Sequence, residues 1–533
     1  MGQGGAPGRM AAGIRAGSGG RPLARAAGPL RAVADVPRAP EAALPLRAPD
    51  GADAAPPRAG DRPLSRQPPA LLVAGRRRRA QAVRPRSRPG PGLRLPARPV
   101  PGRAVRRARV AAVAAAGRLM RLMLAVHGFP PAAGGGTEIY VHDLARCLRD
   151  DFGDEVLVLA READAARPEL AVRREEREGL RLVFVNNTFR AGRSFADTYR
   201  NAAITELAAR VAEEFAPDAV HVHHLTGLST DLVGALAAAG LPVIVTLNDY
   251  WLMCQRGQLL DLDYERCPGP WPEGCARCLH TELAAAAERL RHVREVLERA
   301  RFLLAPSPTL RRKFLDLGLD GARLRLVEQG IDHRPFRRVT RARSDRLRLG
   351  FAGSLMVSKA PHVALDAFGG LPEGAAMLTL YGAYAPYHGD DRYRERLEPL
   401  LARPGVRHAG AVPHARMAEA FAEMDVLVVP SIWIENAPFV IREAFVAGVP
   451  VVASDLGGMR DLVDPETSGL LFIPGDAADL RRALRRLLEE PELLPWLRRG
   501  IPAVKTIQQD AAETRERHRA PGPAVAADAM GAR

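Results

Sequence analysis

The sequence predicts an α/β protein with two consecutive doubly wound, Rossmann-like domains. From residue 121 onward, short apolar runs alternate with helical stretches, a pattern typical of parallel sheets with right-handed crossovers. Runs such as 156–159 and 243–246 are apolar at every position, as strands covered by helices on both faces are. A basic, proline-containing and aperiodic stretch at 333–346 interrupts the alternation. We therefore expect two domains joined by a linker.

The first β-α series predicts an N-terminal domain at 120–332. Its helices are expected at 204–215 and 281–300, among others. The expected strands are 122–127, 155–160, 180–185, 219–223, 242–247 and 302–306.

The second series predicts a C-terminal domain at 347–510, with its last strong helix at 477–490. Ligands bind outside the carboxyl ends of strands in such sheets, so two such domains predict a shared cleft between them. The final stretch can return to pack on the first domain, and residues 511–533 are expected to form a disordered tail. The expected strands are 347–353, 377–381, 406–412, 426–430, 449–454 and 470–473.

The basic character of the chain belongs to its first 119 residues. They hold 24 Arg, no Lys and 5 acidic residues, whereas the remainder carries a net charge of −3. The globular part therefore gives no sign of a nucleic-acid partner. The leader (residues 1–119) is rich in Ala, Arg, Pro and Gly, and we expect it to be disordered. It resembles a transit peptide in charge but not in Pro and Gly content. We favour a natural start at Met120.

Other features of the sequence bear on the cellular compartment in which we expect the protein. No run reaches the roughly 18 apolar residues that span a bilayer, and no apolar signal-peptide core follows the N-terminus. Five cysteines in 533 residues do not suggest a secreted disulfide framework. We expect a cytoplasmic protein that can lie at the inner face of a membrane.

Two loops that follow expected strands carry residues suited to phosphate. Gly134–Gly136 precede an expected helix, and glycines there let a ligand approach the helix N-terminus closely. This segment is not a GxGxxG fingerprint, which lowers the case for a dehydrogenase. The loop after 347–353 contains Gly353, Ser354 and Lys359, and a lysine there can neutralise a phosphate. The alternative is an ordinary turn and a solvated lysine.

A third loop, after 426–430, carries two carboxylates eight residues apart. Glu435 lies in the loop, Glu443 falls about a turn into the next helix, and Asn436 is a candidate N-cap. Carboxylates at the mouth of a cleft can accept hydrogen bonds from sugar hydroxyls and stabilise positive charge at an anomeric carbon. The alternative is a capped surface helix with exposed acids.

Together these segments resemble glycosyltransferase family 4 over roughly 120–510. The E-x7-E element (Glu435, Glu443), the run at 447–454, Gly457-Gly458 and the run at 469–472 match the donor domain of that family. The segments 134–138, 222–225 and 330–332 match more weakly. The resemblance implies the two-domain GT-B fold, retention of anomeric configuration and no cofactor for catalysis.

The resemblance also implies roles for individual residues. Lys359 holds the leaving diphosphate, Glu435 contacts the donor sugar, and Glu443 binds the ribose. The sequence departs from the family at two positions, with Ser354 where Arg is common and Asn248, followed by Asp249, where His is common. Either Asn248 and Asp249 serve catalysis differently, or activity is reduced. The donor-binding set is completed by Gly135, Gly136, Gly353, Ser354, Asn436, Ala437, Pro438, Phe439 and Val440.

Two further groups of residues could bind metal. Cys254, Cys267, Cys275 and Cys278 lie within 25 residues, which suggests a structural zinc site or, alternatively, four free thiols. His221 and His223 share one face of an expected strand. We expect one of them to reach the cleft and His224 to point away, which excludes a metal triad.

The function expected is transfer of a hexosyl group from a UDP- or GDP-sugar to a carbohydrate or lipid-linked acceptor, in cell-surface polysaccharide or glycoconjugate synthesis. One alternative is a catalytically degenerate homologue, and another is a protein that binds nucleic acid or membrane through its leader. A sugar phosphorylase is a third. A chain that starts at Met120 should keep activity only if the enzyme hypothesis is correct.

Overall fold

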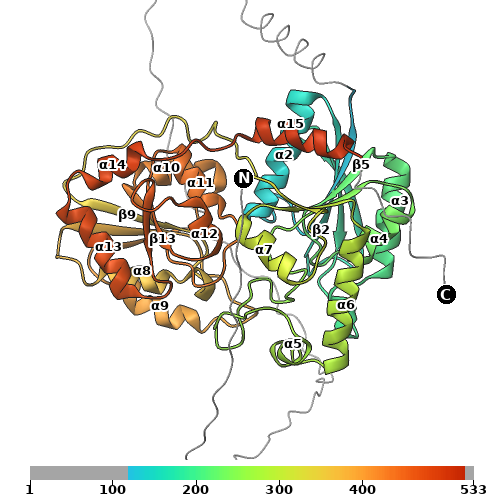
Figure 1. The fold of residues 1–533 in the computed structure, drawn as a ribbon, viewed down its shortest axis with the longest axis horizontal. Coiled ribbons are helices and arrows are strands. Elements are labelled where there is room, and N and C mark those ends of the chain that lie inside the picture. The colour runs from blue at the N-terminus through green and yellow to red at the C-terminus, as the bar shows by residue number, and fades with distance from the viewer. Residues whose placement is uncertain (1–117, 522–533) are drawn as a thin grey trace, which may run out of the picture. The chain divides into compact units, whose positions relative to one another are not determined.

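The computed structural model describes residues 118–521, which form two α/β units (Figure 1). Most of the leader, and residues 522–533, lie outside this range, so the expectations for them remain untested. Within residues 118–521, none of the helices combines the length and apolar character needed to cross a bilayer.

The first unit contains an eight-stranded sheet with the order β3-β4-β2-β1-β5-β6-β7-β8. All neighbouring strands run parallel except β3 and β4. β5, β6 and β7 are buried at every position, and the apolar runs 156–159 and 243–246 are buried as predicted. The strands are β1 (Arg121–Val126), β2 (Glu155–Glu162), β3 (Val172–Arg177), β4 (Leu180–Asn186), β5 (Ala219–Val222), β6 (Val243–Thr246), β7 (Phe302–Ala305) and β8 (Leu324–Leu326).

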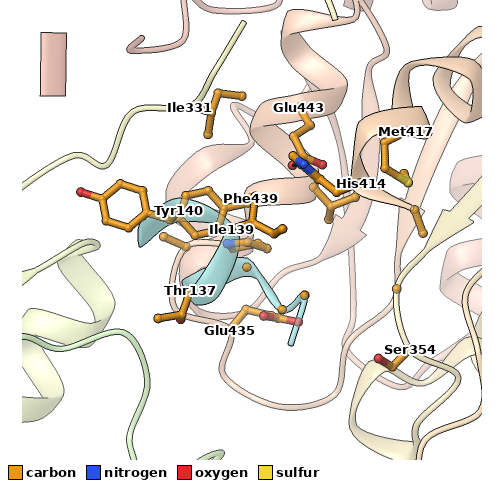
Figure 2. Close-up of a pocket in the computed structure, with 18 of the residues that line it drawn as sticks. Thr137, Ile139, Tyr140, Ile331, Ser354, His414, Met417, Glu435, Phe439 and Glu443 are labelled. Carbon is orange, nitrogen blue, oxygen red and sulfur yellow. Dashed lines mark hydrogen bonds and ion pairs between the residues drawn. The ribbon is translucent and has the colours of Figure 1, made fainter. Parts of the chain in front are cut away.

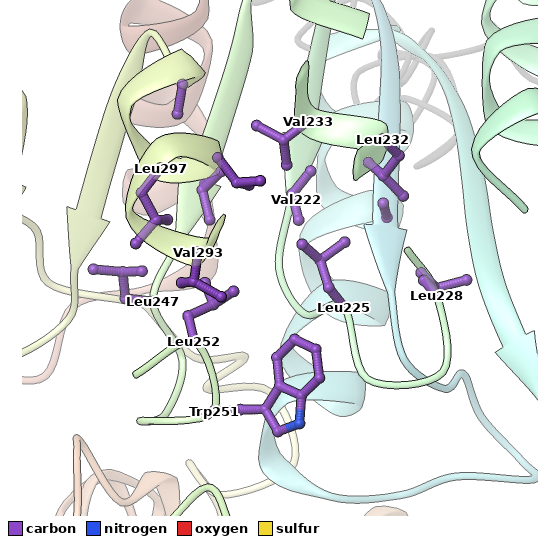
Figure 3. Close-up of a cluster of buried hydrophobic side chains, with 14 of the residues drawn as sticks. Val222, Leu225, Leu228, Leu232, Val233, Leu247, Trp251, Leu252, Val293 and Leu297 are labelled. Carbon is purple, nitrogen blue, oxygen red and sulfur yellow. The ribbon is translucent and has the colours of Figure 1, made fainter. Parts of the chain in front are cut away.

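Helices connect these strands and cover the sheet. Most of them form one hydrophobic core with β5, β6 and the segment after β6, which includes Leu232, Val293 and Trp251 (Figure 3), whereas the first helix belongs to a second core. The helices are α2 (Gly136–Phe152), η1 (Phe195–Thr198), α3 (Ala202–Phe215), α4 (Asp231–Ala238), α5 (Pro272–Leu279), α6 (Leu283–Arg299) and α7 (Pro308–Asp316).

The second unit contains a six-stranded, all-parallel sheet with the order β11-β10-β9-β12-β13-β14. The strands are β9 (Leu347–Ala352), β10 (Ala376–Tyr381), β11 (Val406–Gly410), β12 (Val426–Val429), β13 (Val451–Ser454) and β14 (Gly469–Phe472). The helices are η2 (Val357–Lys359), α8 (Pro361–Phe368), α9 (Tyr393–Leu401), η3 (His414–Arg416), α10 (Met417–Ala422), α11 (Phe439–Val446), α12 (Gly457–Leu462), α13 (Ala477–Glu489) and α14 (Leu493–Arg499).

The last helix, α15 (Ile507–Arg519), returns to the first unit and packs beside α2 (Figure 1). Ile507 and Ala511 are buried in the same core as α2 and β1. The Thr506 and Gln509 side chains close a capping box at its start, which satisfies N–H groups that a helix start leaves unpaired. The disordered tail expected from residue 511 is therefore wrong as far as residue 519.

Two strands escaped the sequence prediction because neither has the pattern that was sought. β3 reads Val-Arg-Arg-Glu-Glu-Arg and lies at the sheet edge, where charged residues are tolerated. β8 has three residues, and Arg325 and Leu326 are exposed. Both are edge strands, so only one neighbouring strand constrains their composition.

Candidate functional site

The carboxyl ends of strands from both sheets surround one cavity of about 590 Å³. The loop after β1 and the loop after β6 line it from the first unit, and the loops after β9, β10, β11 and β12 line it from the second (Figure 2). All the predicted catalytic and donor-binding residues line this cavity. Parallel strands end at one edge of their sheet, which is why residues far apart in sequence converge here.

Glu435 and Lys359 form an ion pair inside the cavity. Lys359 Nζ lies 2.6 Å from Glu435 Oε1, and the carboxylate side chain is 5% exposed against 31% for the lysine. The same oxygen accepts hydrogen bonds from Ser431 Oγ at 2.7 Å and Trp433 Nε1 at 2.9 Å. Three donors thus fix one oxygen of Glu435, while the more exposed ammonium keeps access to the cavity. The ammonium can contact a phosphate by exchanging this partner.

Glu443 pairs with a histidine that the sequence analysis did not select. His414 Nε2 lies 2.7 Å from Glu443 Oε1, and the two side chains face each other in Figure 2. Burial alone would lower the pKa of His414, but the hydrogen bond and charge of Glu443 outweigh burial and raise it. One oxygen of Glu443 is therefore held by His414, and the Glu443 side chain lines the cavity.

The glycine loop of the first unit lies directly against the second unit. A Cβ atom on Gly136 would come within 2.8 Å of the Phe439 ring, so glycine is required for this approach. The rings of Tyr140 and Phe439 stack with centroids 5.7 Å apart. Glycine is also required at position 458, beside the loop that carries Asn436. A Cβ atom on Gly458 would lie 1.5 Å from the Asn436 carbonyl oxygen.

Asn436 joins the two units instead of capping α11, which has Pro438 at its N-cap position. Its amide group donates to the carbonyl oxygens of Asn248 at 3.0 Å and Leu247 at 3.3 Å. Its own oxygen accepts from Ser307 Oγ at 3.0 Å. The helix-cap expectation was wrong because α11 starts three residues later.

Asn248 belongs to the same network. Its amide nitrogen donates to the carbonyl oxygen of His223 at 2.9 Å, and its side-chain oxygen accepts from Gln329 Nε2 at 2.9 Å. The Gln329 carbonyl oxygen in turn accepts from the buried Arg442 at 3.0 Å. Both ends of the Asn248 amide are thus bonded within the first unit, and its backbone carbonyl oxygen accepts from Asn436 of the second unit, which accounts structurally for Asn at this position.

Asp249 presents a carboxylate to the cavity from the first unit. Its Oδ2 lies 3.0 Å from His224 Nε2, and its Oδ1 accepts from the Trp251 backbone N–H at 2.8 Å. The His224 ring lies 4.0 Å from the His127 ring, which pairs with Glu138 at 3.2 Å. Asp249 is 31% exposed, so it is anchored yet open to the cavity.

The expectation that His221 or His223 reaches the cleft was wrong. His221 and His223 are each 1% exposed and do not line the cavity, and burial lowers the pKa of His223 to about 3. They contact His518 and Tyr140 from α15 and α2. His224, expected to point away from the cleft, does not line the cavity either, but its ring contacts the carboxylate of Asp249, which does.

The four cysteines on the segment 254–278 are free thiols. Burial raises the pKa of Cys254 and Cys267, and that of Cys275 to about 11. Among residues 118–521, no group of three or more His, Cys, Asp or Glu side chains is placed to hold a metal ion. The geometry therefore gives no support to the zinc hypothesis, which a metal assay would test.

Several cavity residues were missed by the sequence analysis. His414 follows the strand β11, so the rule that functional loops follow strands could have found it. Trp433 stands inside the third loop itself. The others became visible only through tertiary contacts; the missed residues are Tyr140, Asp143, Gln329, His414 and Trp433.

Comparison with known families agrees with this architecture. The model described as Glycosyltransferase Family 4 matches residues 134–334, and the model described as Glycosyl transferases group 1 matches residues 332–499. Together they span more than half of the chain. Two facing Rossmann-like units with a shared cavity define the GT-B fold. The chain belongs to glycosyltransferase family 4.

Curated relatives include several glycosyltransferases. A sulfoquinovosyl transferase of Arabidopsis thaliana is 26% identical over 70% of this chain and 67% of its own. A D-inositol 3-phosphate glycosyltransferase of Xylanimonas cellulosilytica is 29% identical over 66% and 83%. A GDP-mannose-dependent alpha-mannosyltransferase of Mycobacterium tuberculosis is 33% identical over 36% and 48%.

Solved structures share the fold. Anabaena HepE in complex with UDP has a TM-score of 0.55 at 18% identity, covering 75% of this chain and 100% of that one. Sucrose-phosphate synthase from Thermosynechococcus elongatus has a TM-score of 0.57 at 20% identity, covering 75% and 98%. At this identity the likeness concerns the fold.

Proposed function

We propose that this glycosyltransferase moves a hexosyl group from a UDP- or GDP-sugar to a carbohydrate or lipid-linked acceptor, with retention of configuration. The observation that carries the proposal is the convergence of Glu435, Glu443 and Lys359 on one cavity. A solved structure of the same fold contains UDP and glucose, and one curated relative is named for its use of GDP-mannose.

The proposed chemistry follows from the charges on the second-unit wall. Lys359 stabilises the leaving diphosphate once that group displaces Glu435 from the ammonium, and Glu435 stabilises the oxocarbenium-like sugar. The free oxygen of Glu443 accepts from the ribose hydroxyls. The backbone N–H groups at the start of α2 lie across the cavity, where they can meet the diphosphate.

A thermal-shift panel of UDP, GDP, ADP and their sugars tests nucleotide recognition. One nucleotide should stabilise the full chain, by about 2.7 kcal/mol at a hundredfold excess over its dissociation constant. The stabilisation should shrink in Glu443→Ala and should persist without added magnesium. If no nucleotide shifts the melting curve, the transferase proposal loses its main support.

The alternative hypothesis, a catalytically degenerate homologue, predicts nucleotide binding without turnover. Nucleotide would bind, but no release of nucleoside diphosphate would follow with any acceptor. The hydrogen bonds of the Asn248 side chain favour the active enzyme, since they give the departure from His a structural explanation and leave Asp249 in the cavity.

A further inference from the structure

The two walls of the cavity differ in charge. Among the described residues that line it, Lys359 on the second unit is the only Lys or Arg. On that unit Lys359 is paired with Glu435, and His414 is paired with Glu443, so the cations and carboxylates of this wall offset one another. The wall from the first unit contributes no Lys or Arg among these lining residues, but it contributes Asp143, Asp249 and Asp332.

The charge of Asp332 is compensated within the wall. The Arg334 guanidinium donates to both of its oxygens, to Oδ1 at 2.9 Å and to Oδ2 at 2.7 Å. Burial opposes ionisation of Asp332, but the hydrogen bonds and charge of Arg334 outweigh burial and lower its pKa. Asp332 therefore adds little negative potential to the cavity.

The charge of Asp249 is not compensated by its partner. The Thr226 N–H donates to His224 Nδ1 at 3.1 Å, so that nitrogen must carry a lone pair. The ring proton then lies on Nε2, which donates to Asp249 Oδ2 at 3.0 Å. His224 is thus a neutral donor that orients the carboxylate without cancelling its charge. Asp143, 20% exposed, contacts the ring of His142 at 3.2 Å and adds a second acidic group.

We infer that the acceptor end that enters this cavity is an uncharged polyhydroxylated group, with a hydroxyl donating to Asp249. This inference rests on the proposed function, because it assumes that the donor diphosphate lies at Lys359. A carboxylate accepts strong hydrogen bonds from hydroxyl groups. It repels a phosphate or carboxylate brought against it. An anionic portion of the acceptor therefore has to lie away from the reacting hydroxyl.

The test compares matched acceptors in the full-length protein, with UDP-glucose and GDP-mannose as donors and release of nucleoside diphosphate as the readout. The pairs are glucose and glucose 6-phosphate, mannose and mannose 6-phosphate, and inositol and inositol 3-phosphate. We expect a neutral member to be used at least about tenfold more efficiently than its phosphorylated counterpart. Equal or better use of the phosphorylated members, or use of no neutral member, overturns the inference.

Asp249→Asn separates a role in selectivity from a role in folding. The substitution keeps the shape but removes the charge, so kcat/KM for the neutral acceptor should fall about tenfold and the preference over phosphate should shrink. Asp263→Asn, at an exposed position of the same segment, is the matched control and should leave both values unchanged. An unaltered preference in Asp249→Asn contradicts the assignment.

The thermal-shift panel distinguishes the two proposals. If no nucleotide stabilises the protein, the proposed function fails first. If a nucleotide binds equally well to the wild type and Asp249→Asn, but acceptor preference follows the phosphorylated compounds, only the acceptor inference fails.

Discussion

The two walls of the cavity are built in different ways. On the second unit, charged side chains meet one another directly, as in the pairs Lys359–Glu435 and His414–Glu443. On the first unit, a glycine loop supplies backbone, and polar side chains such as Asn248 are held by other parts of the chain. The second wall is thus equipped for charge stabilisation, and the first for close approach and orientation.

Removing the Glu435 charge should have the largest effect on the chemical step. Glu435→Gln keeps the side-chain shape, but it removes the carboxylate opposite the developing positive charge. Turnover should fall about 10²- to 10³-fold, the range for loss of one preorganised electrostatic group. Steady-state release of nucleoside diphosphate measures it.

Glu419→Gln, an exposed change on α10, is the matched control and should leave turnover unchanged. Nucleotide stabilisation should persist in Glu435→Gln. Turnover within threefold of the wild type would show that the second wall does not supply the charge that catalysis needs.

Lys359→Ala should have the next largest effect. The substitution removes a charge-assisted contact to the leaving diphosphate worth about 1.5–3 kcal/mol, or roughly ten- to a hundredfold in rate. Nucleoside diphosphate release again gives the measurement, with Lys313→Ala on α7 as the control. Unchanged turnover in Lys359→Ala would refute the role assigned to this lysine.

The second wall was far easier to predict from sequence than the first. Glu435 and Glu443 lie on one loop-helix segment, so their spacing of eight residues carries the information. The strands of both sheets were likewise predicted from the sequence, except β3 and β8 at the two edges of the first sheet. By contrast, Asn248 receives a hydrogen bond from Gln329, 81 residues away in sequence, and Tyr140 donates to Asp510 of α15. Local pattern does not encode such pairings.

Asn436→Ala tests whether the network between the units holds the first wall in place. The truncation leaves the carbonyl oxygens of Leu247 and Asn248 and the Ser307 hydroxyl without their partner in a buried site. Unfolding free energy should fall by about 1–3 kcal/mol, as measured by denaturant titration. Asn436→Asp keeps the acceptor for Ser307 but loses both donated bonds. An unchanged denaturation midpoint in Asn436→Ala would show that the units associate without this network.

The smallest expected effect is a pH dependence at the His414–Glu443 pair, which is confined to the second wall. Because the folded-state pKa of His414 is raised, the pair contributes its full stability below the unfolded value of about 6.5. That contribution disappears as the pH rises through the raised folded-state pKa. The difference in unfolding free energy between the wild type and His414→Gln should therefore be largest below about pH 6.5 and should shrink as the pH rises through the raised folded-state pKa of His414. Denaturant titrations at a series of pH values measure this difference.

His280→Gln, at an exposed position, should show no comparable trend. A difference that stays constant with pH would mean that His414 holds Glu443 as a neutral donor, as His224 holds Asp249, and the two walls would then orient their carboxylates in the same way.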